Sequence, residues 1–306
     1  MPTSKISLYF LGTDAFASTN LKRLLGDERF EVLGVVVPPD KRVGRKQELK
    51  PCVVKVLAME MGLEVLHAPE ELLGREMDFL VVVSYGVILG DEILGLPKVA
   101  ALNVHGSLLP KYRGASPIAS VILNGDEVTG VSVMKVVKKM DAGPVYAVAE
   151  VAIDSKDTEP VLRARMAEVG AELLAQVMPG IVNGSVEPQE QDESKVTHSG
   201  KIDRNSGRIN WGNETATQIE RKMRAYDPWP GIFTEFKGKR LKILKGHAKE
   251  GKTEKIGIIN EVEGEIGIGT KEGFLICEEL QLEGKKALLI NDFVRGQDDF
   301  VGASLE

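Results

Sequence analysis

Residues 99–117 read VAALNVHGSLLPKYRGASP, and this stretch decides the fold of the chain. A short apolar run leads into Asn103-Val104-His105 and ends at Gly106, where a loop rich in Pro and Gly begins. An apolar run between such breakers is typical of a buried parallel strand. Ligands bind open α/β sheets at the carboxyl ends of their parallel strands, so we expect a site where this strand ends.

The end of this strand carries polar side chains that need an explanation. Asn103 and His105 are two positions apart, so they project to the same side of a strand. Burying them without partners would be costly, which points to a functional role. A third polar candidate, Asp141, lies downstream in a turn, MDAGP, at 140–144. The ordinary alternative is a satisfied core histidine and two residues that close turns.

Length and composition set broad limits on the protein. The 306 residues can hold two domains, and 43% hydrophobic with 27% charged residues is ordinary for a soluble protein. There is no apolar run long enough to span a bilayer and no secretion signal, so we expect no membrane partner. Cys52 and Cys277 are far apart and read as thiols rather than as a disulfide or metal site. A reducing cytoplasm suits this composition.

The charge pattern leaves nucleic-acid binding open. A net charge of −6 argues weakly against it. Residues 41–50 nevertheless hold five basic and one acidic residue, and residues 201–250 hold twelve basic and six acidic. These two basic stretches indicate either a solvated surface or an RNA contact.

The first two thirds of the chain alternate between strands and helices. Strands are predicted at 6–11, 32–37, 63–66, 79–83, 99–105, 129–137 and 145–153, and helices up to 25 and at 53–61, 117–123 and 160–182. This order predicts an α/β class domain over 1–189 with a Rossmann-like, mostly parallel sheet. No G-x-G-x-x-G follows the first strand, so a nicotinamide cofactor is not expected. The basic stretch 41–50, between Pro39 and Pro51, is predicted to be a mobile loop.

The last third has a different character. A polar stretch without apolar periodicity predicts a linker over 190–205. A helix at 215–225 follows, and then short strand-like runs at 232–236, 240–244, 255–259, 265–269 and 274–282, separated by glycines. Several short strands with turn signals predict a small all-β barrel domain over 206–306.

The motifs around the central strand carry a family resemblance. Residues 103–110 (NVHGSLLP), Tyr112-Arg113-Gly114 and the 140–143 turn, at this spacing, resemble the folate-dependent formyltransferases. The resemblance runs from near Ile6 almost to the end of the chain. It implies a formyltransferase domain followed by an OB-like domain, with 10-formyltetrahydrofolate as co-substrate and no metal.

The resemblance also implies where the folate would bind. The segment after strand 79–83 would border the pterin ring, together with the loop after His105 and with Asp141. The implied folate-binding residues are Ser84, Tyr85, Gly86, Val87, Ile88, Leu89, Ser107, Leu108, Leu109, Pro110 and Asp141. For the apolar side chains at 87–89, a plain helix core is an equal alternative.

Within the family, two features resemble the members that act on tRNA. One is the basic loop at 41–50, where the resemblance implies that Arg42, Arg45 and Lys46 contact the acceptor end. The other is RAYDPWPG at 224–231. They imply that initiator methionyl-tRNA receives the formyl group and that the C-terminal domain binds tRNA. We expect no DNA partner.

The three polar residues suit the chemistry of formyl transfer. An amine attacks the formyl carbonyl and creates a tetrahedral oxyanion, to which the Asn103 amide can donate. His105 can relay protons near neutral pH, while Asp141 can orient His105 and order a water molecule. Because the substrate amine is the nucleophile, neither a serine or cysteine nucleophile nor a metal is required.

Competing interpretations make different predictions. Sugar-nucleotide formyltransferases share the three residues and also have a C-terminal domain, so they are the nearest alternative. Glycinamide ribonucleotide formyltransferases are shorter, and formyltetrahydrofolate hydrolases carry a regulatory domain before the catalytic one. An RNA-binding protein without catalysis would have lost part of Asn103, His105 and Asp141, and all three are present.

Overall fold

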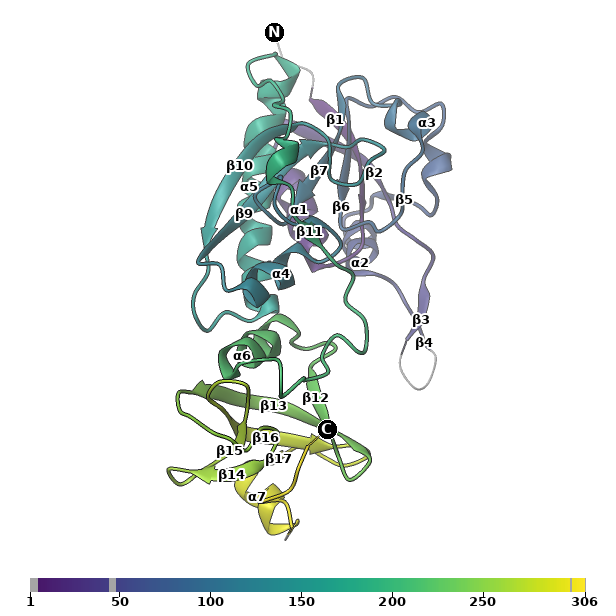
Figure 1. Ribbon diagram of the computed structural model, residues 1–306. Helices are drawn as coiled ribbons and strands as arrows, with labels where there is room; N and C mark the ends of the chain where they lie inside the picture. Colours follow the sequence, from purple (N-terminus) through teal and green to yellow (C-terminus); the bar gives the residue numbers. More distant parts are fainter. Residues whose placement is uncertain (1–4, 44–47, 298, 306) are drawn as a thin grey trace. The chain divides into compact units, whose positions relative to one another are not determined.

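The computed structural model describes residues 5–43, 48–297 and 299–305, and its ribbon is drawn in Figure 1. It divides into two compact units. The first comprises 1–117, 128–152 and 161–199, and the second comprises 118–127, 153–160 and 200–306. No helix in these described ranges is long and apolar enough to cross a membrane.

A seven-stranded sheet forms the centre of the first unit (Figure 1). Its order is β10-β9-β7-β6-β1-β2-β5. Strands β1 (Ile6–Gly12), β2 (Phe30–Val36), β5 (Glu64–Leu66), β6 (Phe79–Val83) and β7 (Ala100–His105) run parallel. Strands β9 (Val128–Lys135) and β10 (Val145–Ala152) add an antiparallel edge. The predicted mostly parallel, Rossmann-like sheet is confirmed.

Helices supply the remaining core of this unit. They are α1 (Ala15–Leu25), α2 (Val53–Glu60), α3 (Asp91–Leu94), most of α5 (Glu159–Val182) and the 3-10 turn η1 (Pro69–Leu72). All but the first residue of α4 (Pro117–Asn124) belongs to the second unit. Asp14 caps α1 by accepting from the Ala17 N–H at 3.0 Å. Helix α1 packs against α2 and against β1, β2 and β6. Of the apolar side chains that repeat along α5, Leu162, Met166 and Val177 are buried, whereas Val169, Leu173 and Ile181 are partly exposed.

The basic stretch at 41–50 differs from the prediction. Instead of a structureless loop, it holds two short strands, β3 (Lys41–Val43) and β4 (Glu48–Lys50), paired antiparallel. Pairing satisfies their backbone groups, so the flanking prolines mark the base of a hairpin. Arg42 is exposed on β3. Arg45 and Lys46 lie outside the described residues.

The second unit is built on an antiparallel sheet. Strands β12 (Ile232–Phe236), β13 (Lys239–Lys249), β16 (Phe274–Leu282), β15 (Glu265–Gly269) and β14 (Ile259–Val262) follow in this order, and β17 (Leu288–Leu289) pairs with β16. Helix α6 (Ala216–Ala225) packs on β13, and α7 (Ile290–Arg295) packs on β16. Its core includes Phe300, edge-on to Phe236 and Phe293. This arrangement confirms the expected small β domain.

One local prediction in this unit was wrong, and one helix was not predicted. The strand predicted at 255–259 begins only at Ile259, because Gly257 adopts a left-handed conformation (φ 71°) that interrupts an extended run. Helix α7 was not predicted, since its six residues are too few to show a helical period.

Candidate active site

Strand β7 delivers Asn103 and His105 to the carboxyl edge of the sheet. Asn103 is paired with Val82 of β6 and Met134 of β9, and His105 is paired with Ser132 of β9. The sheet therefore fixes the Asn103 backbone on both sides and the His105 backbone on the β9 side. The His105 ring is buried, whereas Asn103 is half-buried. Within the described part of the chain, the Asn103 amide makes no hydrogen bond to another residue, so its donors remain available to a ligand.

The His105 ring is held by a backbone carbonyl. Its Nε2–H donates to the Tyr112 oxygen at 3.0 Å. Because a carbonyl oxygen can only accept, Nε2 carries the hydrogen and Nδ1 is the basic nitrogen of the neutral ring. Nδ1 faces Asp141 Oδ1 at 3.7 Å, which is longer than a hydrogen bond. The sequence pointed to Asp141 as the orienting group and missed the carbonyl, which no residue type signals.

Asp141 lies in the connection between β9 and β10, so the predicted antiparallel pair does place it at a tip. Its Oδ2 accepts from the Gly114 N–H at 2.8 Å, which leaves Oδ1 toward His105. The structure thus brings together His105 and Asp141, which are 36 positions apart in the sequence.

Strained backbone conformations gather around this site. Ser84, Tyr112 and Asp141 have φ values of 48°, 59° and 51°, in the left-handed region that favours glycine. Each such residue costs on the order of 1–3 kcal/mol and persists only where its surroundings hold it. Ser84 directly follows β6, the Tyr112 carbonyl holds His105, and Asp141 faces His105. The strain therefore lies on the segments that shape one edge of the sheet.

The loop after His105 is braced by two serines. Ser107 Oγ donates to the Lys111 carbonyl at 2.6 Å, and Ser132 Oγ donates to the Ser107 carbonyl at 2.7 Å. The Leu109 N–H donates to Ser132 Oγ at 3.0 Å. Ser107 is fully buried, whereas Leu108, Leu109 and Pro110 are partly exposed. Of these candidate folate residues, the leucines and the proline are therefore the accessible ones.

The segment after β6 divides into buried and exposed residues. Tyr85 and Leu89 belong to a hydrophobic core cluster, and burial raises the pKa of the Tyr85 hydroxyl. Val87 and Ile88 are 51% and 79% exposed in an irregular segment, so the helix-core alternative is wrong for these two. The Ser84 carbonyl accepts from Thr13 Oγ1 at 2.7 Å, which ties this segment to the end of β1.

Half of the basic residues at 201–250 are paired with carboxylates. Of the twelve basic residues at 201–250, six pair with carboxylates, namely Arg208, Lys222, Arg224, Lys237, Lys245 and Lys249. Arg240 instead lies over the Phe233 ring at 3.8 Å, and Lys242 Nζ lies 3.5 Å from the Pro230 carbonyl. The sequence could not distinguish most paired cations from unpaired ones, because partners such as Glu279 and Glu265 lie on other strands. The Arg224–Glu220 pair within α6 is an exception.

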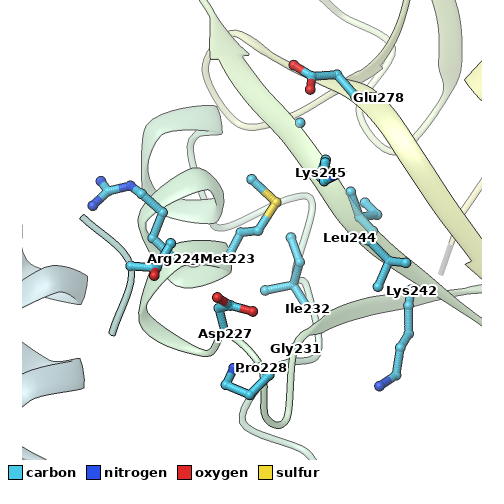
Figure 2. A pocket seen from close by; sticks show the side chains of 13 residues that line it. Met223, Arg224, Asp227, Pro228, Gly231, Ile232, Lys242, Leu244, Lys245 and Glu278 are labelled. Atoms are coloured by element: carbon cyan, nitrogen blue, oxygen red, sulfur yellow. The ribbon is translucent and has the colours of Figure 1, made fainter. Parts of the chain in front are cut away.

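The RAYDPWPG motif borders a concavity of about 390 Å³ in the second unit (Figure 2). Met223, Asp227 and Ile232 line it, and Figure 2 shows the Arg224 and Lys242 head groups pointing away from them. Arg224 donates to Glu220 at 2.7 and 3.0 Å and to the Asp157 carbonyl at 3.1 Å, so it stabilises α6 and ties this helix to the 153–160 segment.

Neither thiols nor metal ligands gather near the site. Cys52 and Cys277 are free, and burial raises the pKa of the Cys277 thiol to about 12. Over residues 5–43, 48–297 and 299–305, no group of His, Cys, Asp and Glu side chains could hold a metal ion.

Comparison with known proteins places the chain in a family. Residues 5–178 match the Formyl transferase family, and residues 201–298 match the Formyl transferase C-terminal domain. The methionyl-tRNA formyltransferase of a Dehalococcoides mccartyi strain is 41% identical over 99% of this chain and 99% of its own length. The chain belongs to the methionyl-tRNA formyltransferase family. The enzyme of that name from Caldicellulosiruptor saccharolyticus is 39% identical over 95% of this chain and 97% of its own length.

Solved structures outside this family share the fold. WlaRD, a sugar 3N-formyl transferase crystallised with dTDP and 5-N-formyl-THF, superposes with a TM-score of 0.68 at 20% identity. The likeness covers 93% of this chain and 100% of that one. The fold of methionyl-tRNA formyltransferases is thus shared with sugar formyltransferases, and the substrate must be argued from the family and from the site. The resemblance inferred from the motifs is confirmed.

Proposed function

We propose that this chain transfers the formyl group of 10-formyltetrahydrofolate to the amino group of initiator methionyl-tRNA, giving N-formylmethionyl-tRNA for translation initiation. Full-length similarity to methionyl-tRNA formyltransferases supports the substrate pair. The observation that carries the chemistry is His105 facing Asp141 at 3.7 Å beside the half-buried Asn103 amide. We place the reaction in the cytoplasm, in keeping with two free thiols.

The protein must stabilise the oxyanion, remove a proton from the amine and deliver a proton to the leaving nitrogen. The amine nitrogen bonds to the formyl carbon, and the carbonyl oxygen becomes an oxyanion that accepts a hydrogen bond from the Asn103 amide. The amine must lose a proton, and N10 of the folate must gain one as its bond to the formyl carbon breaks. The catalytic group Asn103, His105 and Asp141 would supply these steps by itself.

His105 would exchange the proton through Nδ1. Its Nε2–H is committed to the Tyr112 carbonyl, so Nδ1 is the atom that takes up a proton. The charged ring would then face Asp141 Oδ1, which stabilises it by opposite charge. The present 3.7 Å separation would shorten when the ring becomes charged, as such contacts commonly tighten in reacting complexes.

The folate would lie along the ends of β6 and β7. Val87 and Ile88 offer exposed apolar side chains there, while Ser84, Tyr85, Gly86 and Leu89 would contribute backbone groups. The partly exposed Leu108, Leu109 and Pro110 would form a second wall with Asp141, and Ser107 would hold that wall in place.

The tRNA would contact the β3–β4 hairpin and the second unit. Exposed Arg42 is a candidate for phosphate or base contacts, and Arg45 and Lys46 remain candidates from the sequence. In the second unit, Arg240 and Lys242 are better candidates than the six paired cations, because they would not have to give up a carboxylate.

A direct test is single-turnover formyl transfer from 10-formyltetrahydrofolate to initiator methionyl-tRNA. We expect His105→Ala and Asp141→Asn to lower the rate by about 10²–10⁴-fold while leaving the thermal unfolding midpoint near that of the wild type. Wild-type rates in both variants would remove these residues from the mechanism.

A further inference from the structure

The polar segment 189–199 is bonded to the catalytic edge of the first unit. It begins with two backbone bonds of 2.8 Å between Gln189 and Val145 of β10. It ends in β11 (His198–Ser199), which pairs parallel with β8 (Arg113–Gly114). In between lies the 3-10 turn η2 (Glu193–Lys195). Both ends are therefore tied to strands and loops that carry the site.

Gln191 is the residue of this segment that reaches the catalytic turn. Its Nε2 donates to the carbonyls of Asp141 at 2.8 Å and of Gly143 at 2.7 Å. Its Oε1 accepts from the Arg113 Nε–H at 2.9 Å. Both amide hydrogens and the oxygen are thus engaged, which fixes the orientation of the side chain.

Arg113 holds Gln191 and other residues of the 189–199 segment through hydrogen bonds. It is 1% exposed, and besides Gln191 it donates to Glu193 at 2.8 Å, while its backbone N–H donates to the Thr197 carbonyl at 2.9 Å. The next residue, Gly114, donates its N–H to the Asp141 carboxylate at 2.8 Å. The 113–114 pair therefore supports Asp141 twice, directly and through Gln191.

We propose that Gln191 is a positioning residue for Asp141, and that Arg113 acts through it. The proposal rests on the proposed function. Asp141 has a left-handed backbone, which persists only where neighbours hold it. Gln191 grips the carbonyls on both sides of Ala142 and so sets where the Asp141 carboxylate faces His105.

The decisive variant is Gln191→Glu, which has the same shape but lacks the two donors. A carboxylate oxygen would stand against two carbonyl oxygens, so the turn must shift. We expect kcat for formyl transfer to methionyl-tRNA to fall roughly 10–100-fold, the cost of a misplacement of about 1 Å, with both KM values within about twofold of the wild type. Gln191→Met, which removes the donors without adding charge, should give a loss in the same range.

A double-mutant cycle separates positioning from mere stabilisation. In an Asp141→Asn background, Gln191→Glu should change the residual single-turnover rate by less than about twofold, because its effect passes through the missing carboxylate. Lys195→Gln is the matched control, since this exposed residue of the same segment pairs, among the described residues, only with Asp192. It should leave kcat unchanged.

The outcomes are distinguishable. Wild-type kcat in both Gln191 variants, or losses that multiply fully in the Asp141→Asn background, would overturn the positioning role. Full activity in Asp141→Asn would remove Asp141 from the mechanism and with it the positioning role of Gln191. No formyl transfer by the wild type would instead overturn the proposed function on which the inference rests.

Discussion

At the scale of single residues, the site depends on a division of tasks between backbone and side chains. The Tyr112 carbonyl orients His105, and the Gly114 N–H orients Asp141. Their side chains are thereby left with one reactive atom each, Nδ1 and Oδ1, facing one another. Asn103 differs because the described residues give its amide no partner, as expected of a group that donates to substrate.

Asn103→Asp tests the donor role with almost no change in shape. The variant keeps the size of the side chain but replaces an amide donor with a carboxylate that repels an oxyanion. We expect kcat to fall at least about 10²-fold, the usual cost of losing one oxyanion donor. Single-turnover assays of formyl transfer measure this rate, and calorimetric unfolding provides the control for folding. A variant that folds and keeps its kcat would contradict the role.

At the scale of elements, the β9–β10 connection carries Asp141 and leaves little room for change. A Cβ at Gly143 would lie 1.9 Å from the Lys135 carbonyl oxygen, so the two strands could not close as they do. Gln191 donates a hydrogen bond to the carbonyl oxygen of Gly143 itself. The glycine is therefore required by close backbone approach rather than by an unusual φ.

Gly143→Ala should consequently damage activity through geometry alone. We expect kcat to fall by about 10²-fold as the turn moves by about 1 Å. Gly90→Ala is the matched control, because a Cβ there meets nothing within 4 Å. Rates of both variants, measured beside their unfolding midpoints, check the argument; equal rates in the two would refute it.

Another element-level prediction concerns the end of α1. Arg29 donates to Asp27 at 2.6 and 2.8 Å, and with Arg23 it holds the pKa of Asp27 well below its ordinary value, against the opposing effect of burial. A lowered pKa in the folded state stabilises the protein above the unfolded value of about 3.9, and this contribution is lost as the pH falls toward the folded value.

Asp27→Asn should therefore weaken the pH dependence of the free energy of unfolding at acid pH. We expect the free energy of unfolding of the variant to depend less on pH between about 5 and 2 than that of the wild type, and to be lower at neutral pH. Urea unfolding at a series of pH values measures both slopes. Identical slopes would mean that the Arg29–Asp27–Arg23 contacts add no stability.

At the scale of the whole molecule, a chain of net charge −6 must bind a polyanion through local fields. Half of the basic residues at 201–250 are held by carboxylates. Arg240 and Lys242, whose side chains pair with no carboxylate among the described residues, are two cations that we expect to meet phosphates. Each phosphate contact adds about −0.7 to −0.9 to the slope of log affinity against log salt.

Replacing Arg240 and Lys242 by Gln should reduce the magnitude of that slope by about one to two. Lys245→Gln, which removes a cation already paired with Glu279, should leave the slope nearly unchanged. Filter binding of initiator methionyl-tRNA between low and moderate salt measures both. A wild-type affinity that is flat over this range would show that the second unit is not a tRNA surface.

Much of this organisation could be predicted from the sequence, and the reasons are local. The apolar runs of β6 and β7 and the turn at Asp141 are set by neighbours in the chain, so their places were predicted correctly. The Tyr112 carbonyl and Gln191 could not be found, because a carbonyl has no residue signature and the polar stretch that contains Gln191 resembles a linker. Long-range ion pairs could not be predicted either, because their two residues lie far apart in the sequence.

The most direct test of the central claim is one assay with two acceptors. Formyl transfer from 10-formyltetrahydrofolate is measured with initiator methionyl-tRNA and, in parallel, with a 4-amino-sugar nucleotide. We predict transfer to the tRNA alone, lost in Asn103→Asp. Transfer to the sugar alone would keep the Asn103, His105 and Asp141 chemistry but contradict the tRNA assignment, and transfer to neither would contradict the proposed function.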